Sequence, residues 1–470
     1  MKKHIITLLL ISLLISSAFI GVSNPSLDLT QEFGETEQTT THRNNGLMSS
    51  SWPMFQHDAM HTGLSQSLFP NTFTQIWDAG YNEDFFSQPL FFSSPVIANG
   101  KVFQLGGNFN IVKIFAIDEN DGKLIWKRYI FAPALRTSPW FNTPAFINGK
   151  LFICVGTTLT LISRSKLIAL DENTGDIIWK KTLLGNSIFP SVMVAEGKII
   201  VGGHLTNHIP LSRVYVFNET NGKCLWKSKI ILGFLETTPV ISDNKIIITT
   251  GWLPGLFWMI PNSWLPPKLL QKSRIYAFDI DNGDILWMKN IEGYMLFSSP
   301  TVSNEKLFIP SNIIYDRHNC DCRINVLNLD NGEEIWSYNI EHNWSRWPTT
   351  ISTPSVAYGK VFVIVADGRA FALDEDHGEV IWMKKILEDI PFDSFLFSPP
   401  EVPPVVVDGK IICQAVEVGV REWTHICMFN ESNGEVIWDL KIQGYSRAPF
   451  AVANEKLFMH KGYDTIYAFG

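Results

Sequence analysis

Residues 166–180 read Lys-Leu-Ile-Ala-Leu-Asp-Glu-Asn-Thr-Gly-Asp-Ile-Ile-Trp-Lys, and three of them carry a pattern that the rest of the chain repeats. Gly175 follows Asp171 by four residues, and Trp179 follows Gly175 by four more. Two apolar runs joined by such a turn are typical of a β-hairpin, because a short polar side chain bonds the turn backbone and glycine adopts a positive φ. The stretch therefore predicts two antiparallel strands, the second of which carries Trp179.

This motif occurs seven times in the 470 residues, with Asn in place of Asp in three copies. An eighth tryptophan, Trp77, lies in a strand-like run with no such turn before it, whereas residues 464–469 form a first strand with no tryptophan after it. The two half-motifs complement each other, so the two ends of the chain are predicted to share one repeat. The full copies are Asp118/Gly122/Trp126, Asp171/Gly175/Trp179, Asn218/Gly222/Trp226, Asp279/Gly283/Trp287, Asn328/Gly332/Trp336, Asp374/Gly378/Trp382 and Asn430/Gly434/Trp438.

A second hairpin signal precedes each copy. In residues 95–101 a proline begins a short apolar strand, and Asn99-Gly100 joins it to the next strand. Each repeat of 46 to 61 residues therefore holds four antiparallel strands. Strands such as 114–117 are apolar on both faces, so the sheets must pack face to face.

We therefore predict an all-β fold, an eight-bladed β-propeller of four-stranded antiparallel blades. The N-terminal strand around Trp77 would complete the C-terminal blade and so remove an open sheet edge. Two smaller β-domains are the alternative, but they leave the complementary half-motifs at the chain ends unexplained.

Residues 1–23 are predicted to be a signal peptide, because Lys2 and Lys3 precede an apolar run over 5–22 and small residues follow it. The same run is about long enough to remain as an uncleaved membrane anchor. Residues 24–50 are polar and lack hydrophobic periodicity, which predicts a disordered linker, and 51–470 form the propeller. The protein is expected to be exported and to lie outside the cytoplasm or at the cell surface.

The formal net charge of −8 and the lack of basic runs argue against nucleic acid as a partner. Six cysteines in so long a chain do not make a disulfide scaffold, although export would permit disulfides. Cys413 and Cys427 lie seven residues on either side of Val420, and a hairpin centred there would place them opposite each other as a candidate disulfide. Cys154 and Cys224 are expected to be buried strand thiols.

Strand alternation places the short turns of every repeat on one face of the ring, which we call the turn face. The longer connections emerge on the opposite face, the loop face, and long loops on one face of a rigid ring are where ligands are expected. The longest loop, residues 251–272, would either expose a hydrophobic patch that docks a partner protein or a membrane surface, or fold over the centre of the ring as a buried lid. Its candidate residues are Trp252, Phe257, Trp258 and Trp264.

Two other connections on the loop face combine arginine with tryptophan. Such clusters suit an acidic or aromatic ligand, although packing within an ordered loop is the simpler explanation. The residues are Arg136 with Trp140, and Arg346 with Trp344 and Trp347.

Four side chains of metal-ligand type stand within seven residues of another loop: Asp316, His318, Cys320 and Cys322. Such ligands suit zinc or copper, but so short a span strains tetrahedral geometry. Solvated thiols or a local disulfide account for the two cysteines without a metal. We therefore predict no metal site and keep these four residues as candidates only.

The repeat Ala169-Leu-Asp-Glu-Asn-Thr-Gly-Asp-Ile-Ile-Trp179 is similar to the tryptophan-docking repeat of the pyrroloquinoline-quinone (PQQ)-type propellers. The stretch Trp52-Pro-Met-Phe-Gln-His-Asp-Ala-Met-His-Thr-Gly63 resembles the leader of exported members. The resemblance covers residues 52–470 and implies that each motif tryptophan stacks on the neighbouring blade. The eight structural residues are then Trp77, Trp126, Trp179, Trp226, Trp287, Trp336, Trp382 and Trp438.

Members of this family fall into quinoprotein dehydrogenases and non-enzymatic propellers such as the bacterial outer-membrane assembly scaffold. The dehydrogenases commonly stack the quinone on a disulfide between adjacent cysteines, and this chain has no Cys-Cys pair and no C-x-x-C-H haem site. We therefore expect a monomeric, non-catalytic scaffold without a cofactor, whose loop face binds a protein or a cell-surface ligand. The alternatives are an oxidoreductase that uses PQQ with calcium, or a metal, at the same face, and a purely structural envelope protein. Membrane contact would be made through the N-terminal segment or the 251–272 loop.

Overall fold

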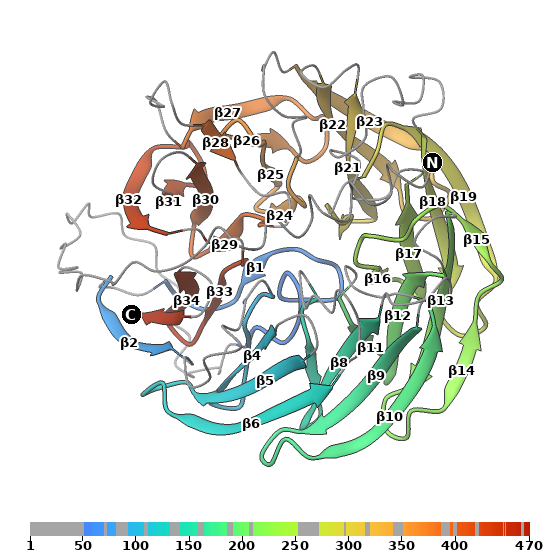
Figure 1. The fold of residues 1–470 in the computed structure, drawn as a ribbon. Helices are drawn as coiled ribbons and strands as arrows, with labels where there is room; N and C mark the ends of the chain where they lie inside the picture. Colours follow the sequence, from blue (N-terminus) through green and yellow to red (C-terminus); the bar gives the residue numbers. More distant parts are fainter. Residues whose placement is uncertain are drawn as a thin grey trace, which may run out of the picture.

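The computed structural model describes residues 51–69, 73–80, 93–107, 111–131, 142–157, 164–185, 191–205, 210–251, 272–295, 298–314, 320–341, 351–386, 395–397, 402–418, 423–444, 446, 448–461 and 465–470. They form eight β-sheets arranged as blades around one axis (Figure 1). The predicted all-β, eight-bladed propeller is confirmed. Within these ranges no helix has the length and apolar character needed to cross a bilayer.

The blades are numbered in chain order, and the first strand of each lies nearest the axis (Figure 1). Blade 1 holds β3 (Val96–Ala98), β4 (Lys101–Gly107), β5 (Ile111–Asp118) and β6 (Leu124–Phe131); blade 2 holds β7 (Ala145–Ile147), β8 (Lys150–Thr157), β9 (Arg164–Asp171) and β10 (Ile177–Leu184). Blade 3 holds β11 (Met193–Ala195), β12 (Lys198–His204), β13 (Leu211–Asn218), β14 (Cys224–Lys227) and β15 (Ile231–Leu232); blade 4 holds β16 (Val240–Ser242), β17 (Lys245–Thr250), β18 (Lys272–Asp279) and β19 (Ile285–Glu292).

Blade 5 holds β20 (Thr301–Ser303), β21 (Lys306–Ile314), β22 (Cys320–Asn328) and β23 (Glu334–Ile340); blade 6 holds β24 (Ser355–Ala357), β25 (Lys360–Ile364), β26 (Arg369–Asp374) and β27 (Val380–Lys385). Blade 7 holds β29 (Val405–Val407), β30 (Lys410–Val418), β31 (Trp423–Asn430) and β32 (Val436–Gln443), and the short strands β1 (Leu64–Ser65) and β28 (Phe395–Phe397) join its sheet. Blade 8 holds β33 (Ala451–Ala453), β34 (Lys456–Lys461), β35 (Thr465–Phe469) and, from the other end of the chain, β2 (Gln75–Gly80).

The motif turn has the predicted chemistry. Asp171 accepts hydrogen bonds through Oδ1 from the amides of Asn173 (2.9 Å) and Thr174 (3.0 Å), and these bonds hold the pKa of its carboxyl below the ordinary value. Gly175 has φ 69°, a conformation that costs other residues energy. A register shift between Ile177 and Trp179 then turns the tryptophan toward the neighbouring blade.

The ring closes as the two half-motifs predicted. Strand β2 pairs antiparallel with β35, and Trp77 lies opposite Ala468. Thr74 and Gly470 exchange backbone hydrogen bonds of 3.2 and 3.0 Å at the end of this pairing. Strand β2 is therefore the outer strand of blade 8, whose three other strands come from the C-terminal end of the chain (Figure 1).

Seven of the eight junctions between blades have an outer contact in which a motif tryptophan packs on the turn glycine of the next blade. A Cβ atom at Gly175 would lie 2.6 Å from the Trp126 ring, so only glycine leaves room for the indole. Trp126 Nε1 also donates to the carbonyl of Glu172 at 2.8 Å. The tryptophan–glycine pairs are Trp77/Gly122, Trp126/Gly175, Trp179/Gly222, Trp226/Gly283, Trp287/Gly332, Trp336/Gly378 and Trp382/Gly434.

A second contact lies on the turn face, where the lysine that begins the second strand of a blade reaches an acidic side chain in the motif turn of the next blade. These lysines are less than one-fifth exposed, so the charges are partly desolvated and must be paired. The pairs are Lys150–Glu219 (3.0 Å), Lys198–Asp281 (3.0 Å), Lys245–Asp330 (2.8 Å), Lys306–Asp376, Lys360–Glu431 (2.8 Å) and Lys456–Glu119 (3.1 Å).

A third contact is a chain of hydroxyl groups close to the axis. Just before each inner strand of blades 1–6 stands a buried Ser or Thr, and in blades 1–5 its amide donates to the hydroxyl of the equivalent residue in the next blade. The bonds run from Ser94 to Thr143 (3.3 Å), Thr143 to Ser191 (2.9 Å), Ser191 to Thr238 (3.0 Å), Thr238 to Ser299 (2.9 Å) and Ser299 to Thr353 (2.8 Å). We did not predict this chain, although Ser-Pro or Thr-Pro dipeptides at five of the six positions are its sequence signal.

Replacing Thr143 with Val is expected to lower the free energy of unfolding by about 1–3 kcal/mol, because the buried Ser94 amide loses its acceptor while side-chain volume is conserved. Urea unfolding followed by tryptophan fluorescence measures the change. Thr182→Val, on the exposed side of β10, is the control and should shift stability by about 0.5 kcal/mol or less. Equal effects of the two changes would contradict a structural role for the hydroxyl chain.

Candidate ligand-binding face and N-terminal plug

Most candidate residues of the loop face lie outside the residues that the structure describes. These are Trp252, Phe257, Trp258 and Trp264 of the 251–272 loop, Arg136 and Trp140, and Trp344, Arg346 and Trp347, together with Asp316 and His318. Of the remaining metal-ligand candidates, Cys320 begins β22, and Cys322 is buried, where its thiol donates to Asn312 Oδ1 at 3.5 Å. The described residues contain no group of three or more side chains arranged to hold a metal ion.

The described part of the loop face is a rigid base for these loops. After the outer strands of four blades, a glycine with positive φ bends the chain inward: Gly185, Gly233, Gly293 and Gly444. In blade 4 the hydroxyl of Ser273 donates to the Gly293 carbonyl (2.9 Å) and accepts from the Met295 amide (3.2 Å). Tyr294 then exchanges two backbone bonds of 2.8 Å with Asn312 of the next blade. The connections are therefore fixed to neighbouring blades at their roots.

A polar cluster lies at the loop-face end of blade 7. Glu417 Oε2 is 3.0 Å from His425 Nε2 and 2.8 Å from Lys441 Nζ, and Lys441 lies 4.9 Å from the centre of the Trp423 ring. Burial raises the pKa of Glu417, but the bonds from Lys441 and His425 outweigh it and hold the pKa below its ordinary value. Burial also lowers the pKa of His425. The carboxylate is therefore ionised and bonded to both neighbours through Oε2, which suits a structural role.

Cys413 and Cys427 are directly opposite each other in β30 and β31, as the hairpin predicted. Both are buried thiols in the structure, and burial raises the pKa of Cys427 to about 12. The disulfide between them stays a prediction. Cys154 is buried as expected, but the prediction for Cys224 was wrong, because β14 is an outer strand and exposes this residue to solvent.

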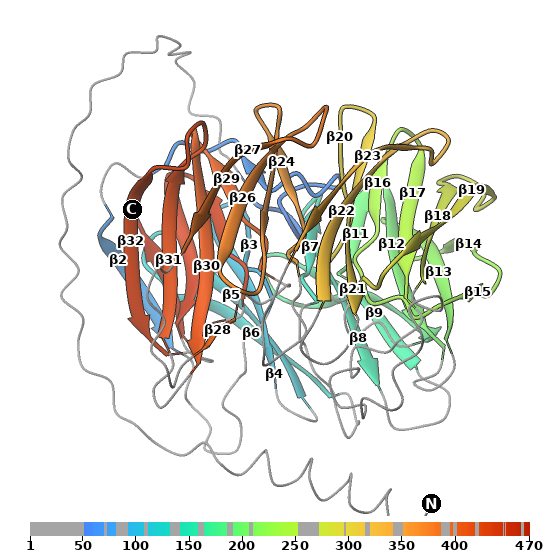
Figure 2. The same cartoon turned by 90° about the horizontal axis from the view of Figure 1, so that it is seen from above.

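The feature that sequence reasoning missed is the leader, residues 52–67, which crosses the centre of the ring on the turn face (Figures 1 and 2). We call this segment the plug. Its carbonyls accept hydrogen bonds from the second residue of six inner strands. The bonds run from Ile97 to Trp52 (3.0 Å), Phe146 to Pro53 (2.8 Å), Ile241 to Ala59 (2.8 Å), Val302 to Met60 (2.9 Å), Val356 to Thr62 (3.0 Å) and Val406 to Gly63 (2.9 Å).

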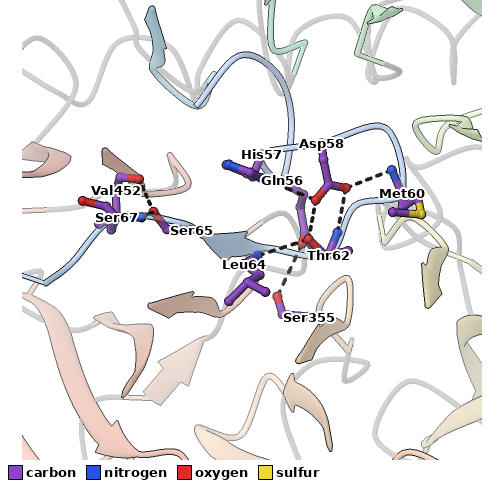
Figure 3. A network of polar contacts seen from close by, with 10 residues as sticks. All are labelled: Gln56, His57, Asp58, Met60, Thr62, Leu64, Ser65, Ser67, Ser355 and Val452. Carbon is purple, nitrogen blue, oxygen red and sulfur yellow. Dashed lines mark hydrogen bonds and ion pairs between the residues drawn. The ribbon is translucent and has the colours of Figure 1, made fainter. Parts of the chain in front are cut away.

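Side chains hold the plug in shape (Figure 3). Asp58 accepts from the amides of Met60 (2.9 Å) and Thr62 (3.2 Å) and from the Thr62 hydroxyl. Gln56 and His61 are buried non-glycine residues with φ 53° and 60°, and His61 Nδ1 lies 2.8 Å from the Pro300 carbonyl. Residues rarely adopt such backbone angles unless their surroundings impose them.

The plug satisfies inner-strand amides that would otherwise form the open edges of the blades. It therefore closes the centre of the ring at the turn face and leaves the loop face as the irregular side. The sequence of the plug does not indicate these contacts, because most of them are made by backbone carbonyls, which every residue possesses.

These features define an eight-bladed β-propeller whose repeat tryptophans pack on the next blade. The sequence model of the family described as outer membrane protein assembly factor BamB matches residues 112–205 and 163–347, and the chain belongs to this family. No curated protein sequence matches the chain.

Solved structures share the fold at low sequence identity. BamB from Moraxella catarrhalis is 16% identical, with a TM-score of 0.51, over 85% of this chain and 97% of that one. Quinohemoprotein alcohol dehydrogenase ADHIIG from Pseudomonas putida HK5 is 12% identical, with a TM-score of 0.57, over 89% and 80%. The quinohemoprotein alcohol dehydrogenase from Comamonas testosteroni is 13% identical, with the same TM-score and coverage. At these identities the likeness is one of fold.

Proposed function

We propose that the protein is an exported, non-catalytic scaffold whose loop face binds a protein or a cell-surface ligand. The observation that carries this proposal is the asymmetry between the two faces. The turn face is built from regular turns and ion pairs and is plugged at its centre by the leader. The connections rich in tryptophan and arginine join strand ends on the opposite face. Described connections of that face, such as Gly293 to Met295, are held by hydrogen bonds within their blade and to the next one.

Membership of the BamB-like family supports a role in protein contacts outside the cytoplasm. The first described residues run beside Ile97, close to a turn of the turn face. If residues 1–23 anchor the protein, the polar segment 24–50 would tether the propeller from its turn face and leave the loop face accessible. We propose that the propeller acts as a monomer on such a tether or, after signal cleavage, free of it.

A cross-linking pull-down from the protein's own cell envelope tests the proposal. The unmodified chain is expected to capture a defined partner, and the double change Trp258→Ala with Trp264→Ala should abolish the capture. A matched control is Ile125→Ala with Ile178→Ala, which removes apolar side chains from the outer wall, where they are 42% and 45% exposed. Capture that survives the loop change, or that the wall change removes equally, would contradict binding through the loop face.

A quinone-dependent oxidoreductase with its site in the same face is the second candidate, because quinohemoprotein dehydrogenases share the fold. The residues present fit the cofactor poorly: the sequence has no adjacent cysteines, and the described residues offer no three-ligand metal group. Titration with PQQ and calcium, read as quinone absorbance, separates the two candidates. A tight one-to-one complex would favour the oxidoreductase.

A further inference from the structure

Among the residues that the structure describes, the junction between blades 7 and 8 has none of the three contacts, whereas every other junction has at least two of them. The third and fourth strands of blade 8 come from opposite ends of the sequence, so no motif turn stands there to receive Trp438. Lys410 instead pairs with Asp408 of its own turn at 2.9 Å. Pro403 and Pro449 occupy the positions that carry the hydroxyl chain in blades 1–6.

Aromatic residues of the N-terminal segment fill the place of the missing outer contact. Phe73 lies between Trp438 of blade 7 and Phe469 of blade 8, with ring centres 4.0 and 4.7 Å away. Phe69 stacks on Phe73 at 6.3 Å, and Lys410 Nζ lies 5.7 Å from the centre of the Phe69 ring. Phe69 and Phe73 are 5% and 4% exposed, so they act as core residues of this junction.

The residues just before them join the inner strands of the same two blades. Strand β1 pairs in parallel with β29 of blade 7, so that Leu64 lies opposite Val406. The Ser65 hydroxyl donates to the carbonyl of Val452 in blade 8 at 2.7 Å, and the Glu455 amide donates to the Ser67 hydroxyl at 2.7 Å (Figure 3 shows the first bond). Blades 7 and 8 are therefore connected through a third segment.

We propose that residues 64–69 and 73 act as a clasp, and that the ring opens at the junction between blades 7 and 8 when this clasp detaches together with the plug. Blades 7 and 8 share direct packing of their sheet faces, as other neighbours do. Elsewhere the tryptophan, lysine or hydroxyl contacts also join a blade directly to its neighbour. At this junction the same continuous segment supplies the aromatic packing, the added strand and the hydroxyl bonds. Loss of the clasp therefore removes all of them at once and frees the inner-strand amides that the plug covers.

Hydrogen exchange of the full-length protein, read by mass spectrometry, tests this inference. Phe73→Ala is expected to raise exchange about tenfold or more in β29, β32, β33 and β35 and at the plug-bonded amides of Phe146, Val302 and Val356, with little change in blade 3 or in the outer strands of blade 2. Trp226→Ala is the matched control, because it removes an aromatic side chain from the junction between blades 3 and 4. That change should raise exchange around its own junction and leave the plug-bonded amides protected.

The unmodified protein supplies a second measurement that does not depend on the variant folding. In urea below the unfolding transition, amides of the blade 7–8 junction and the plug should exchange together, and at lower urea than those of any other junction. If the amides of the blade 7–8 junction exchange only with global unfolding, the proposal is overturned. An even rise of exchange over all blades in Phe73→Ala would do the same. The proposed binding function is independent of this result.

Discussion

Replacing Gly378 with Ala is expected to lower the free energy of unfolding by about 3 kcal/mol. The new Cβ would lie 2.4 Å from the ring of Trp336, so the indole must leave its place on the next blade and strain the bond from its Nε1 to Glu375. Overpacking of this kind costs about 1–3 kcal/mol. The positive φ of 75° adds about 1–2 kcal/mol for any residue with a side chain.

Gly409→Ala is the control that separates the two causes. Gly409 has a similar φ of 70°, but nothing lies within 4 Å of the Cβ that alanine would add. The Gly409→Ala variant should therefore lose only the about 1–2 kcal/mol that a side chain costs at a positive φ. Urea unfolding by circular dichroism measures both variants. If the two variants lose the same stability, indole packing on the glycine contributes nothing to the junction, and the structural role given to the seven tryptophans that pack on a turn glycine is wrong.

Acidification from pH 7 to pH 5 is expected to destabilise the protein well before its carboxylates titrate. Burial lowers the pKa of His61 to about 4 and that of His460 to about 3, so both are neutral in the folded state at pH 5. In the unfolded chain they bind protons near pH 6.5. Their contribution to stability is therefore complete above pH 6.5 and is lost as pH falls toward the folded-state pKa values, by about 2 kcal/mol for each histidine at pH 5.

The measurement is the free energy of unfolding in urea between pH 7 and pH 5. His61→Gln and His460→Gln should each flatten the slope against pH, whatever they do to stability at pH 7. His377→Gln is the control, because the side chain of His377 is 76% exposed. A slope that stays unchanged in both buried-histidine variants would show that other groups cause the acid sensitivity.

The sequence predicted the strands and the ring because the signals involved are local. The Asp171-to-Gly175 turn fixes its own conformation through side-chain and backbone bonds, and repetition of this turn reveals the period. The half-motif at Trp77 indicated closure because the missing strand had to come from the other end of the chain. The exposure of Cys224 was mispredicted because an apolar strand position looks the same on an outer strand as on an inner one.

The sequence predicted which face of the ring carries the candidate site, but not which of its residues come together there. Strand alternation separates short turns from long connections, and the structure places inward-bending glycines such as Gly233 after the outer strands of four blades. Which aromatic residues come together there depends on contacts between loops far apart in sequence. The residues Trp258 and Arg346 therefore stay candidates, and the pull-down described above tests the first of them.

The amino-acid sequence by itself determined the repeat, the strand order and the closure of the ring, because turn chemistry and alternation act over a few residues. Only the tertiary structure showed that residues 52–67 plug the centre and that Phe69 and Phe73 join blades 7 and 8. Those contacts rest on backbone carbonyls and on aromatic packing between residues hundreds of positions apart. No local pattern encodes them, since they exist only once all eight blades stand around one axis.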